Sequence, residues 1–263
     1  MSPKLLMNIR NHNQSAWNKY VEKKDKWTIP FSEKEINEAK NGNWNIVLTP
    51  KIPVPKQWFP ELKGLKILGL ASGGGQQGPI LASLGADVTI FDLSDNQLGQ
   101  DKKVSDEFGL NIKTVQGDMR DLSVFEDESF DLIFNPCSIV FVEELKPVWK
   151  ECFRVLKPNG ILMTGLMNPL AFQIDEENLK LTYKSPFSDL KSLPKEKLDE
   201  LIQQDEALVF GHSWTDQIAG QLKAGFMLND MFEDTWGGEN KFDEYFPAFM
   251  ATRAMKIEVN SIY

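Results

Sequence analysis

Short apolar runs alternate with helix-like segments through the middle of the chain. The runs that read as strands are 66–70, 87–92, 111–115, 130–135 and 160–166. Between them, residues 76–84, 96–108 and 143–156 carry apolar side chains at helical spacing. Strand, helix and strand in succession predict a parallel sheet with right-handed crossovers and helices on both faces, which is a doubly wound, Rossmann-like α/β fold.

The pattern changes after Gly165. Residues 168–212 contain no strand followed promptly by a helix and look like an insertion, within which 195–206 fits a helix that starts after Pro194. A further helix is predicted at 213–224. The runs at 226–234 and 247–257 then predict two late strands, which suggests an antiparallel edge to the sheet.

Residues 1–60 differ in composition from the rest of the chain. They hold four of the seven tryptophans and favour helices near 13–24 and 32–40, the second with Ser32 and Glu35 as a capping box. We expect this segment to be a helical cover or a lid, and residues 61–263 to form the α/β domain. The 168–212 insertion would complete the cover.

Charge and composition narrow the function. The chain has 29 Lys and Arg against 38 Asp and Glu, a net charge of -9, which disfavours a protein that binds nucleic acid through phosphates. Residues 1–60 carry ten basic and five acidic side chains, so the remainder is at -14. The absence of a long apolar run or a secretory core predicts a cytoplasmic protein without a membrane partner. Two cysteines are too few for a disulfide framework and lack the paired spacing of a zinc site.

A glycine-rich loop follows the first strand. Gly73, Gly75 and Gly78 satisfy Gly-x-Gly-x-x-Gly, and Asp92 closes the second strand at the distance expected for a carboxylate that binds a ribose. The loop therefore predicts a nucleoside cofactor without saying which one. The alternative is a glycine turn that only tightens strand–helix packing.

Residues after the third and fourth strands add polar groups at the same end of the sheet. Asp118 follows the third strand, where it could accept from an adenine amino group or could cap the turn at 119–122. Asn135 ends the fourth strand. The stretch 153–160 is, in physical terms, only a helix-to-strand corner.

Five motifs in this order resemble the class I S-adenosylmethionine-dependent methyltransferases of the small-molecule type. They are LGLASGGG at 68–75, Asp92, GDM at 117–119, FDLIF at 130–134 and FRVLKPNGIL at 153–162. The resemblance covers about residues 65–165. It implies a seven-stranded sheet with an antiparallel last strand, S-adenosyl-L-methionine as cofactor and a small-molecule methyl acceptor. The acidity of residues 61–263 suits a cofactor that carries a sulfonium and no phosphate.

The resemblance also implies a set of cofactor-binding residues. These are Ala71, Ser72, Gly73, Gly75, Gln76, Asp92, Leu93, Gln97, Asp118, Met119 and Asn135. The loop would approach the methionine moiety, Asp92 the ribose, Asp118 and Met119 the adenine, and Asn135 the sulfonium. The chain departs from the family at Gly69, where an acid is usual, and at Ala71, where glycine is usual, so the methionine amino group needs other acceptors.

No catalytic residue is predicted. Methyl transfer from a sulfonium depends mainly on holding the acceptor and the methyl group in line, and a base helps only when the acceptor must lose a proton. His212 fits a solvated or capping residue at a helix start, and Cys137 a small packing residue. Six aromatic residues could line the acceptor site or simply pack: Trp17, Tyr20, Phe141, Phe172, Tyr183 and Trp236.

Two other functions remain open from the sequence. An NAD-dependent oxidoreductase could use the same loop and Asp92, but it would need a Tyr/Lys or His pair at the hydride site, and none is evident after the fifth strand. A non-catalytic S-adenosylmethionine-binding sensor or an adaptor protein is the second alternative. The sequence is compatible with a monomer or a homodimer.

Overall fold

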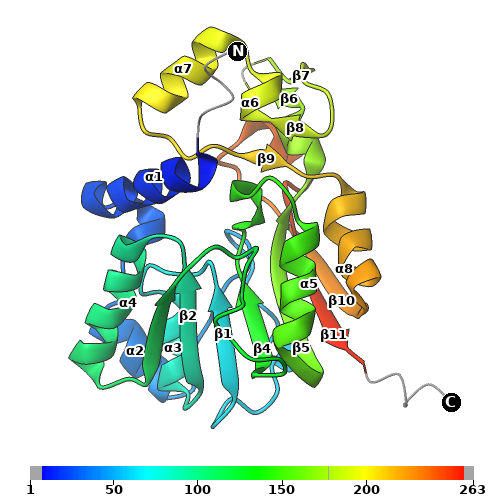
Figure 1. Cartoon of the computed structure of the whole chain (residues 1–263). Coiled ribbons are helices and arrows are strands. Elements are labelled where there is room, and N and C mark those ends of the chain that lie inside the picture. The colour runs from blue at the N-terminus through cyan, green and yellow to red at the C-terminus, as the bar shows by residue number, and fades with distance from the viewer. Residues whose placement is uncertain (1–7, 177, 258–263) are drawn as a thin grey trace, which may run out of the picture.

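The computed structural model describes residues 8–176 and 178–257. A seven-stranded sheet with the order β10-β11-β5-β4-β1-β2-β3 forms its centre (Figure 1). Its strands are β1 (Lys66–Leu70), β2 (Asp87–Asp92), β3 (Ile112–Gln116), β4 (Phe130–Asn135), β5 (Leu156–Met167), β10 (Phe226–Asp234) and β11 (Phe249–Lys256). All five strands predicted between residues 66 and 166, and both late strands, are therefore present.

The strand directions follow the predicted α/β pattern. β1 to β5 pair in parallel, whereas β11 is antiparallel to both β5 and β10. The prediction of a mostly parallel sheet with an antiparallel last strand is thus confirmed. The last strand lies between β5 and β10, so β10 forms the edge of the sheet.

Helices cover both faces of the sheet (Figure 1). The longer helices are α1 (Ile9–Lys23), α2 (Glu33–Lys40), α3 (Gln77–Ser83), α4 (Asp95–Phe108), α5 (Lys146–Val155), α7 (Lys195–Gln203) and α8 (Gly220–Ala224), the last of which continues a π-helical turn at Thr215–Ala219. Side chains of α2, α3 and α4 share one apolar cluster with the sheet, and those of α5 pack on its other face. Successive side chains of a strand point to opposite faces of the sheet. In β1, Ile67 therefore packs in the first cluster and Leu68 in the second.

The inserted segment forms a small layer above the sheet. It contains the two-stranded sheets β6 (Ile174–Asp175) with β7 (Lys180–Leu181) and β8 (Phe187–Ser188) with β9 (Phe210–Gly211), together with α6 (Asp189–Ser192) and α7. Strands of two residues carry no alternating pattern, which is why the sequence did not predict them. Figure 1 shows this layer and α1 at the same end of the sheet.

The N-terminal region is not uniform. The capping box of α2 is present, with Ser32 N donating to Glu35 Oε2 at 2.8 Å. Ile36 of α2 and Trp58 are fully buried in the same cluster as Ile67, so this part of the segment belongs to the main core. In contrast, α1 lies across the carboxyl end of the sheet. Within the described residues, none of the helices has the length and apolar character required to cross a bilayer.

Candidate functional site

A cavity of about 350 Å³ opens at the carboxyl ends of the parallel strands, within the size range of small-molecule sites. Residues that follow each of these strands line it: Ala71 to Gly73 after β1, Asp92 and Leu93 at the end of β2, Gly117 to Arg120 after β3, Pro136 to Ser138 after β4, and Met167 at the end of β5. The crevice at the carboxyl end of an open parallel sheet is the usual ligand site of such folds.

The glycine loop forms one wall of the cavity. Ala71 has a φ of 46°, in the left-handed region that a side chain disfavours, and its N–H donates to Phe91 O at 2.7 Å. A Cβ on Gly73 would lie 2.8 Å from Gln97 Cβ and 3.1 Å from Asp92 Oδ2, so only glycine allows the backbone to pass between these two side chains.

Asp92 stands directly beside this loop. Its Oδ2 accepts from Gly73 N at 3.0 Å and its Oδ1 from Ser94 N at 2.9 Å. Withdrawal from water raises the pKa of Asp92, although these amide hydrogen bonds oppose the shift. A carboxylate has about four lone-pair sites, so each oxygen can still accept a hydrogen bond from a molecule in the cavity.

A second carboxyl group, that of Asp101, is hydrogen-bonded to the backbone of the glycine loop. Asp101 of α4 is fully buried, and its Oδ2 accepts from Gly74 N at 2.9 Å. Burial raises the pKa of Asp101 to about 8. This side chain holds the loop in place and does not line the cavity.

Three buried polar atoms at the cavity have no hydrogen-bond partner within the protein. They are Thr49 Oγ1, Ser72 Oγ and Gln97 Oε1, on side chains that line the cavity and are at most 6% exposed. Buried polar groups are nearly always paired in folded proteins. The protein by itself therefore leaves the hydrogen-bonding capacity of these three atoms unused.

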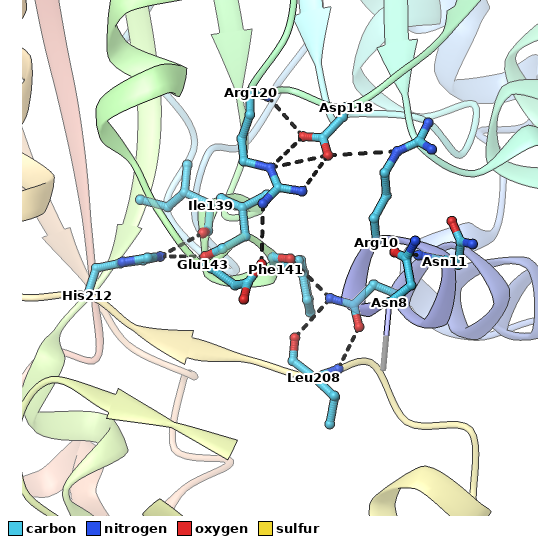
Figure 2. A network of polar contacts seen from close by, with 12 residues as sticks. Asn8, Arg10, Asn11, Asp118, Arg120, Ile139, Phe141, Glu143, Leu208 and His212 are labelled. Atoms are coloured by element: carbon cyan, nitrogen blue, oxygen red, sulfur yellow. Dashed lines mark hydrogen bonds and ion pairs between the residues drawn. The ribbon is translucent and has the colours of Figure 1, made fainter. Parts of the chain in front are cut away.

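An ion-pair network borders the opposite wall (Figure 2). Arg120 donates through Nη2 to Asp118 Oδ2 at 2.6 Å and approaches Glu143 Oε2 at 3.4 Å, while Arg10 Nε of α1 lies 3.8 Å from Asp118 Oδ2. Burial alone would raise the pKa of Asp118, but the hydrogen bonds and charge of Arg120 hold it below its ordinary value. Asp118 Oδ1 also accepts from Arg120 N at 3.0 Å, which is the turn-capping contact that the sequence allowed.

Two residues of the predicted cofactor set do not line the cavity. Asn135 is fully buried at the end of β4, where its Nδ2 donates to Leu70 O and Ser138 Oγ and its Oδ1 accepts from Thr164 Oγ1, each at 2.8 Å. It joins three strands beneath the site. Gly75 contributes its carbonyl to Phe31 N. The other members line the cavity: Ala71, Ser72, Gly73, Gln76, Asp92, Leu93, Gln97, Asp118 and Met119.

α1 closes the cavity from above. Asn13 is buried and bridges the core to the inserted segment, because its Nδ2 donates to Phe141 O and Leu208 O at 3.0 Å and its Oδ1 accepts from Leu208 N at 2.8 Å. Asn18 accepts from Ser94 Oγ at 2.6 Å and donates to Asp95 at 2.8 Å. The helix is therefore fixed both to the inserted segment and to the start of α4, next to Asp92.

The cavity wall offers little acid–base chemistry. Its titratable side chains among the described residues are Arg10, Asp92, Asp118, Arg120, Cys137 and Glu143. Burial raises the pKa of the Cys137 thiol, and Asp118 and Glu143 are paired with Arg120. The expectation of a solvated or capping His212 is wrong: the side chain is buried behind the wall, and its Nε2 donates to Ile139 O at 3.1 Å and Val142 O at 3.0 Å (Figure 2). Burial lowers its pKa.

Much of the cavity wall is apolar and aromatic. Cys137, Met167, Trp236 and Phe249 belong to one apolar cluster there, which we call the apolar end of the cavity. Four of the six predicted aromatic residues line the cavity, namely Trp17, Phe141, Phe172 and Trp236. Tyr20 instead donates to Glu206, and Tyr183 packs edge-on against Phe187.

Sequence reasoning missed Thr49 and Asp101. Thr49 lies in a proline-rich connector whose path is set by distant contacts, so no local signal marks it. Asp101 could have been noticed, because Gln97 and Asp101 stand four residues apart on the helix face that also carries buried Val104.

Known proteins are similar to this chain in sequence and in fold. A methyltransferase-domain family model matches residues 68–164. The uncharacterized methyltransferase YbaJ of Bacillus subtilis (strain 168) is 51% identical over 251 residues, which cover 94% of this chain and 98% of that protein.

Solved structures agree with this fold. An S-adenosylmethionine-dependent methyltransferase from Mesorhizobium loti superimposes with a TM-score of 0.57 at 17% identity, covering 76% of this chain and 94% of that one. The Burkholderia thailandensis 1,6-didemethyltoxoflavin-N1-methyltransferase, with 1,6-didemethyltoxoflavin and S-adenosylhomocysteine bound, gives 0.57 at 12% identity, covering 94% and 87%. At these identities the two structures establish the fold alone. The sequence relationship carries the assignment further: the chain belongs to the class I S-adenosylmethionine-dependent methyltransferases and is an enzyme that transfers methyl groups.

Proposed function

We propose that S-adenosyl-L-methionine binds in the cavity between the glycine loop and α1, and that a small-molecule acceptor takes up its apolar end. Ala71, Ser72, Gly73 and Gln76 would face the methionine moiety. Asp92, Leu93 and Gln97 would hold the ribose, and Asp118 and Met119 the adenine. Asn135 and Gly75 would act indirectly, by fixing the ends of the strands and the loop.

The observation that carries this proposal is the surplus of hydrogen-bond acceptors at the loop. Asp92 and Gln97 line the cavity beside the loop, and Gln97 Oε1 has no partner in the protein, whereas the two arginines that line the cavity are both paired with Asp118. Ribose hydroxyls and an ammonium group supply donors that match those acceptors. The pyrophosphate of a dinucleotide would need donors there instead, so this arrangement favours the methyl donor over NAD.

Positioning is the chemistry that these residues can perform. S-adenosyl-L-methionine, when bound, supplies a methyl group that is already activated for displacement. The loop and Asp92 would fix one end of the reacting pair, and the apolar wall would exclude water and orient the acceptor. Cys137 stays a neutral thiol because burial raises its pKa, so it is neither a nucleophile nor a base in this proposal.

The parts outside the sheet would confine the acceptor. We propose that residues 1–60 act as a cover through α1, while α2 and Trp58 pack in the core, and that the 168–212 insertion completes the cover over the 61–263 methyltransferase domain. Trp17 and Trp27 from the first region, and Phe172 and Val209 from the second, line the same cavity, which supports this division of roles.

A labelled-methyl assay tests the proposal. The protein is incubated with S-adenosylmethionine that carries a labelled methyl group and with a small-metabolite extract, and label is followed into the low-molecular-weight fraction. We expect transfer by the wild type and, within about threefold, by Cys137→Ala, because removing a neutral packing side chain changes only local packing. Failure to transfer label to small molecules, or loss of transfer in Cys137→Ala, would contradict the proposal.

A further inference from the structure

Thr49 lines the cavity and carries a buried hydroxyl group that has no hydrogen-bond partner in the protein. The residue is 2% exposed, it lines the cavity, and its Oγ1 makes no hydrogen bond. A desolvated hydroxyl without a partner costs about 1–3 kcal/mol, so a fold that keeps one at a cavity wall has a use for it when the cavity is filled.

The backbone around Thr49 is held rigidly. Val47 N donates to Gln77 Oε1 at 3.0 Å, and Leu48 O accepts from Cys137 N at 3.0 Å. Lys51 N donates to Asp234 Oδ2 at 2.8 Å. These bonds join the connector to α3, to the loop after β4 and to β10. The Thr49 side chain is therefore preorganised and does not rely on ligand binding for its position.

A glycine in the sheet allows this close approach. A Cβ on Gly165 of β5 would lie 2.1 Å from Leu48 O and 2.9 Å from Cys137 N. Any other residue at this position would push the connector away from the end of β5. The sheet thus accommodates the segment that carries the hydroxyl.

The surroundings of Thr49 are apolar and aromatic. One packed cluster that lines the cavity contains Cys137, Met167, Trp236 and Phe249. The ring centroids of Trp236 and Phe249 are 4.7 Å apart. A Cβ on Gly237 would lie 2.8 Å from Lys51 Cε, which places the Trp236 loop against the Thr49 segment. Flat apolar molecules pack well on such surfaces.

Charged groups near this end are already paired. Asp234 accepts from Lys51 N and Ile52 N, and the side chains of Lys51 and Lys26 form ion pairs with Glu239. None of these five residues lines the cavity. A charged acceptor would therefore lose its hydration without gaining a partner here.

We infer that Thr49 is a specificity-determining residue whose hydroxyl hydrogen-bonds a ring atom or substituent of an uncharged, flat, mainly apolar methyl acceptor. The inference rests on the proposed function, because it takes the apolar end of the cavity as the acceptor site. The methyl acceptor would accordingly belong to the uncharged aromatic or heteroaromatic small molecules.

Binding of two matched probes tests the inference without requiring turnover. Quinoline and naphthalene have nearly the same shape, but only quinoline carries a ring nitrogen that can accept from a hydroxyl. Binding is followed by tryptophan fluorescence in the wild type, in Thr49→Val, which keeps the shape but removes the hydroxyl, and in Thr49→Ser, which keeps the hydroxyl. We expect wild type and Thr49→Ser to prefer quinoline by about threefold to tenfold, and Thr49→Val to lose this preference.

Charge and stability provide further readouts. Quinoline-2-carboxylate should bind the wild type more weakly than quinoline. Thr49→Val should unfold at the same or a higher temperature than the wild type, because no hydrogen bond within the protein is lost. An undiminished quinoline preference in Thr49→Val, no preference in the wild type, tighter binding of the carboxylate, or a destabilised Thr49→Val would each overturn the inference.

Calorimetry with S-adenosylhomocysteine separates this inference from the proposed function. We expect wild type and Thr49→Val to bind it equally. Equal loss of S-adenosylhomocysteine and quinoline binding in Thr49→Val would assign the hydroxyl to the cofactor and overturn the inference. A wild type that shows the Thr49-dependent quinoline preference but no S-adenosylhomocysteine binding would contradict the proposed function and leave the Thr49 site standing.

Discussion

Asp92 accepts two backbone hydrogen bonds and still faces the cavity, so it both shapes the glycine loop and can receive ribose hydroxyls. Replacing it with asparagine removes the charge and one acceptor oxygen. Hydrogen bonds to charged groups contribute about 1.5–3 kcal/mol, so we expect Asp92→Asn to bind S-adenosylhomocysteine roughly tenfold to hundredfold more weakly. Calorimetry measures this, with Asp106→Asn on the exposed face of α4 as control. Equal affinities for both variants would remove Asp92 from the site.

The backbone of Ala71 is strained at the start of the loop, because its φ of 46° lies in the left-handed region. Glycine adopts this conformation without strain, so Ala71→Gly should raise the free energy of unfolding by about 0.5–1 kcal/mol, measured by denaturant titration. The same change at Ala82 in α3 should lower it by about 1 kcal/mol or more, since glycine disfavours helices and a buried methyl group is lost. Destabilisation by Ala71→Gly would show that the loop conformation is not strained.

Asp101 should make stability depend on pH. Its pKa is raised from 3.8 to about 8, so the folded state retains a proton that the unfolded state has already released. Stability should therefore fall as pH rises from about 4 to 8 and level off above the folded pKa, with a slope on the order of 1 kcal/mol per pH unit at most. Subtracting the curve of Asp101→Asn, which mimics the neutral carboxyl group, isolates this contribution from those of Asp92 and Asp189. A difference curve that is flat over this range would show that Asp101 is ionised in the folded protein.

At the scale of elements, α1 depends on polar contacts more than on apolar packing. Asn18 accepts from Ser94 Oγ and bonds both Asp95 and Asn96 at the start of α4. Asn18→Ala should lower the free energy of unfolding by about 1–2 kcal/mol and increase hydrogen exchange in residues 9–23. Asn11→Ala, on the exposed side of the same helix, should change neither quantity. Unchanged exchange in Asn18→Ala would show that other contacts suffice to hold the helix.

Elements were predictable from sequence where they follow a local pattern. The strands around Leu68, Ile90 and Ile133 stand out because buried strands need continuous apolar runs bounded by turn residues. The position of α1 was not predictable. Its partners include Phe141 and Leu208, which are more than 120 residues away in sequence, and no property of the helix itself encodes them.

Within the site, the loop and the residues just after each strand were predictable, because a parallel sheet brings the carboxyl ends of its strands to one edge. The cavity wall around Asp92, Gln97 and Met119 follows from that rule. Thr49 was not predictable, because its place depends on contacts of the connector with β5 and β10. The inward position of Asn135 reflects hydrogen bonds to two neighbouring strands that a single strand does not reveal.

At the scale of the molecule, the uneven charge of the chain corresponds to contacts between its parts. Four of the ten basic residues of 1–60 form ion pairs with acidic residues of the remainder: Arg10 with Asp118, Lys19 with Asp205, and Lys26 and Lys51 with Glu239. Most of these pairs are exposed, so each contributes little to stability. One of them, Arg10 with Asp118, lies at the cavity wall.

Calorimetric titration of the wild-type protein with S-adenosylhomocysteine, set beside a titration with NADH, measures which of the two nucleoside cofactors the cavity binds. The cavity has one glycine loop, an acceptor-rich wall and no arginine free of Asp118 among its described lining residues. We therefore predict saturable binding of one S-adenosylhomocysteine per chain and no heat with NADH. Binding of NADH without binding of S-adenosylhomocysteine would show that the cavity is a dinucleotide site and not a site for the methyl donor.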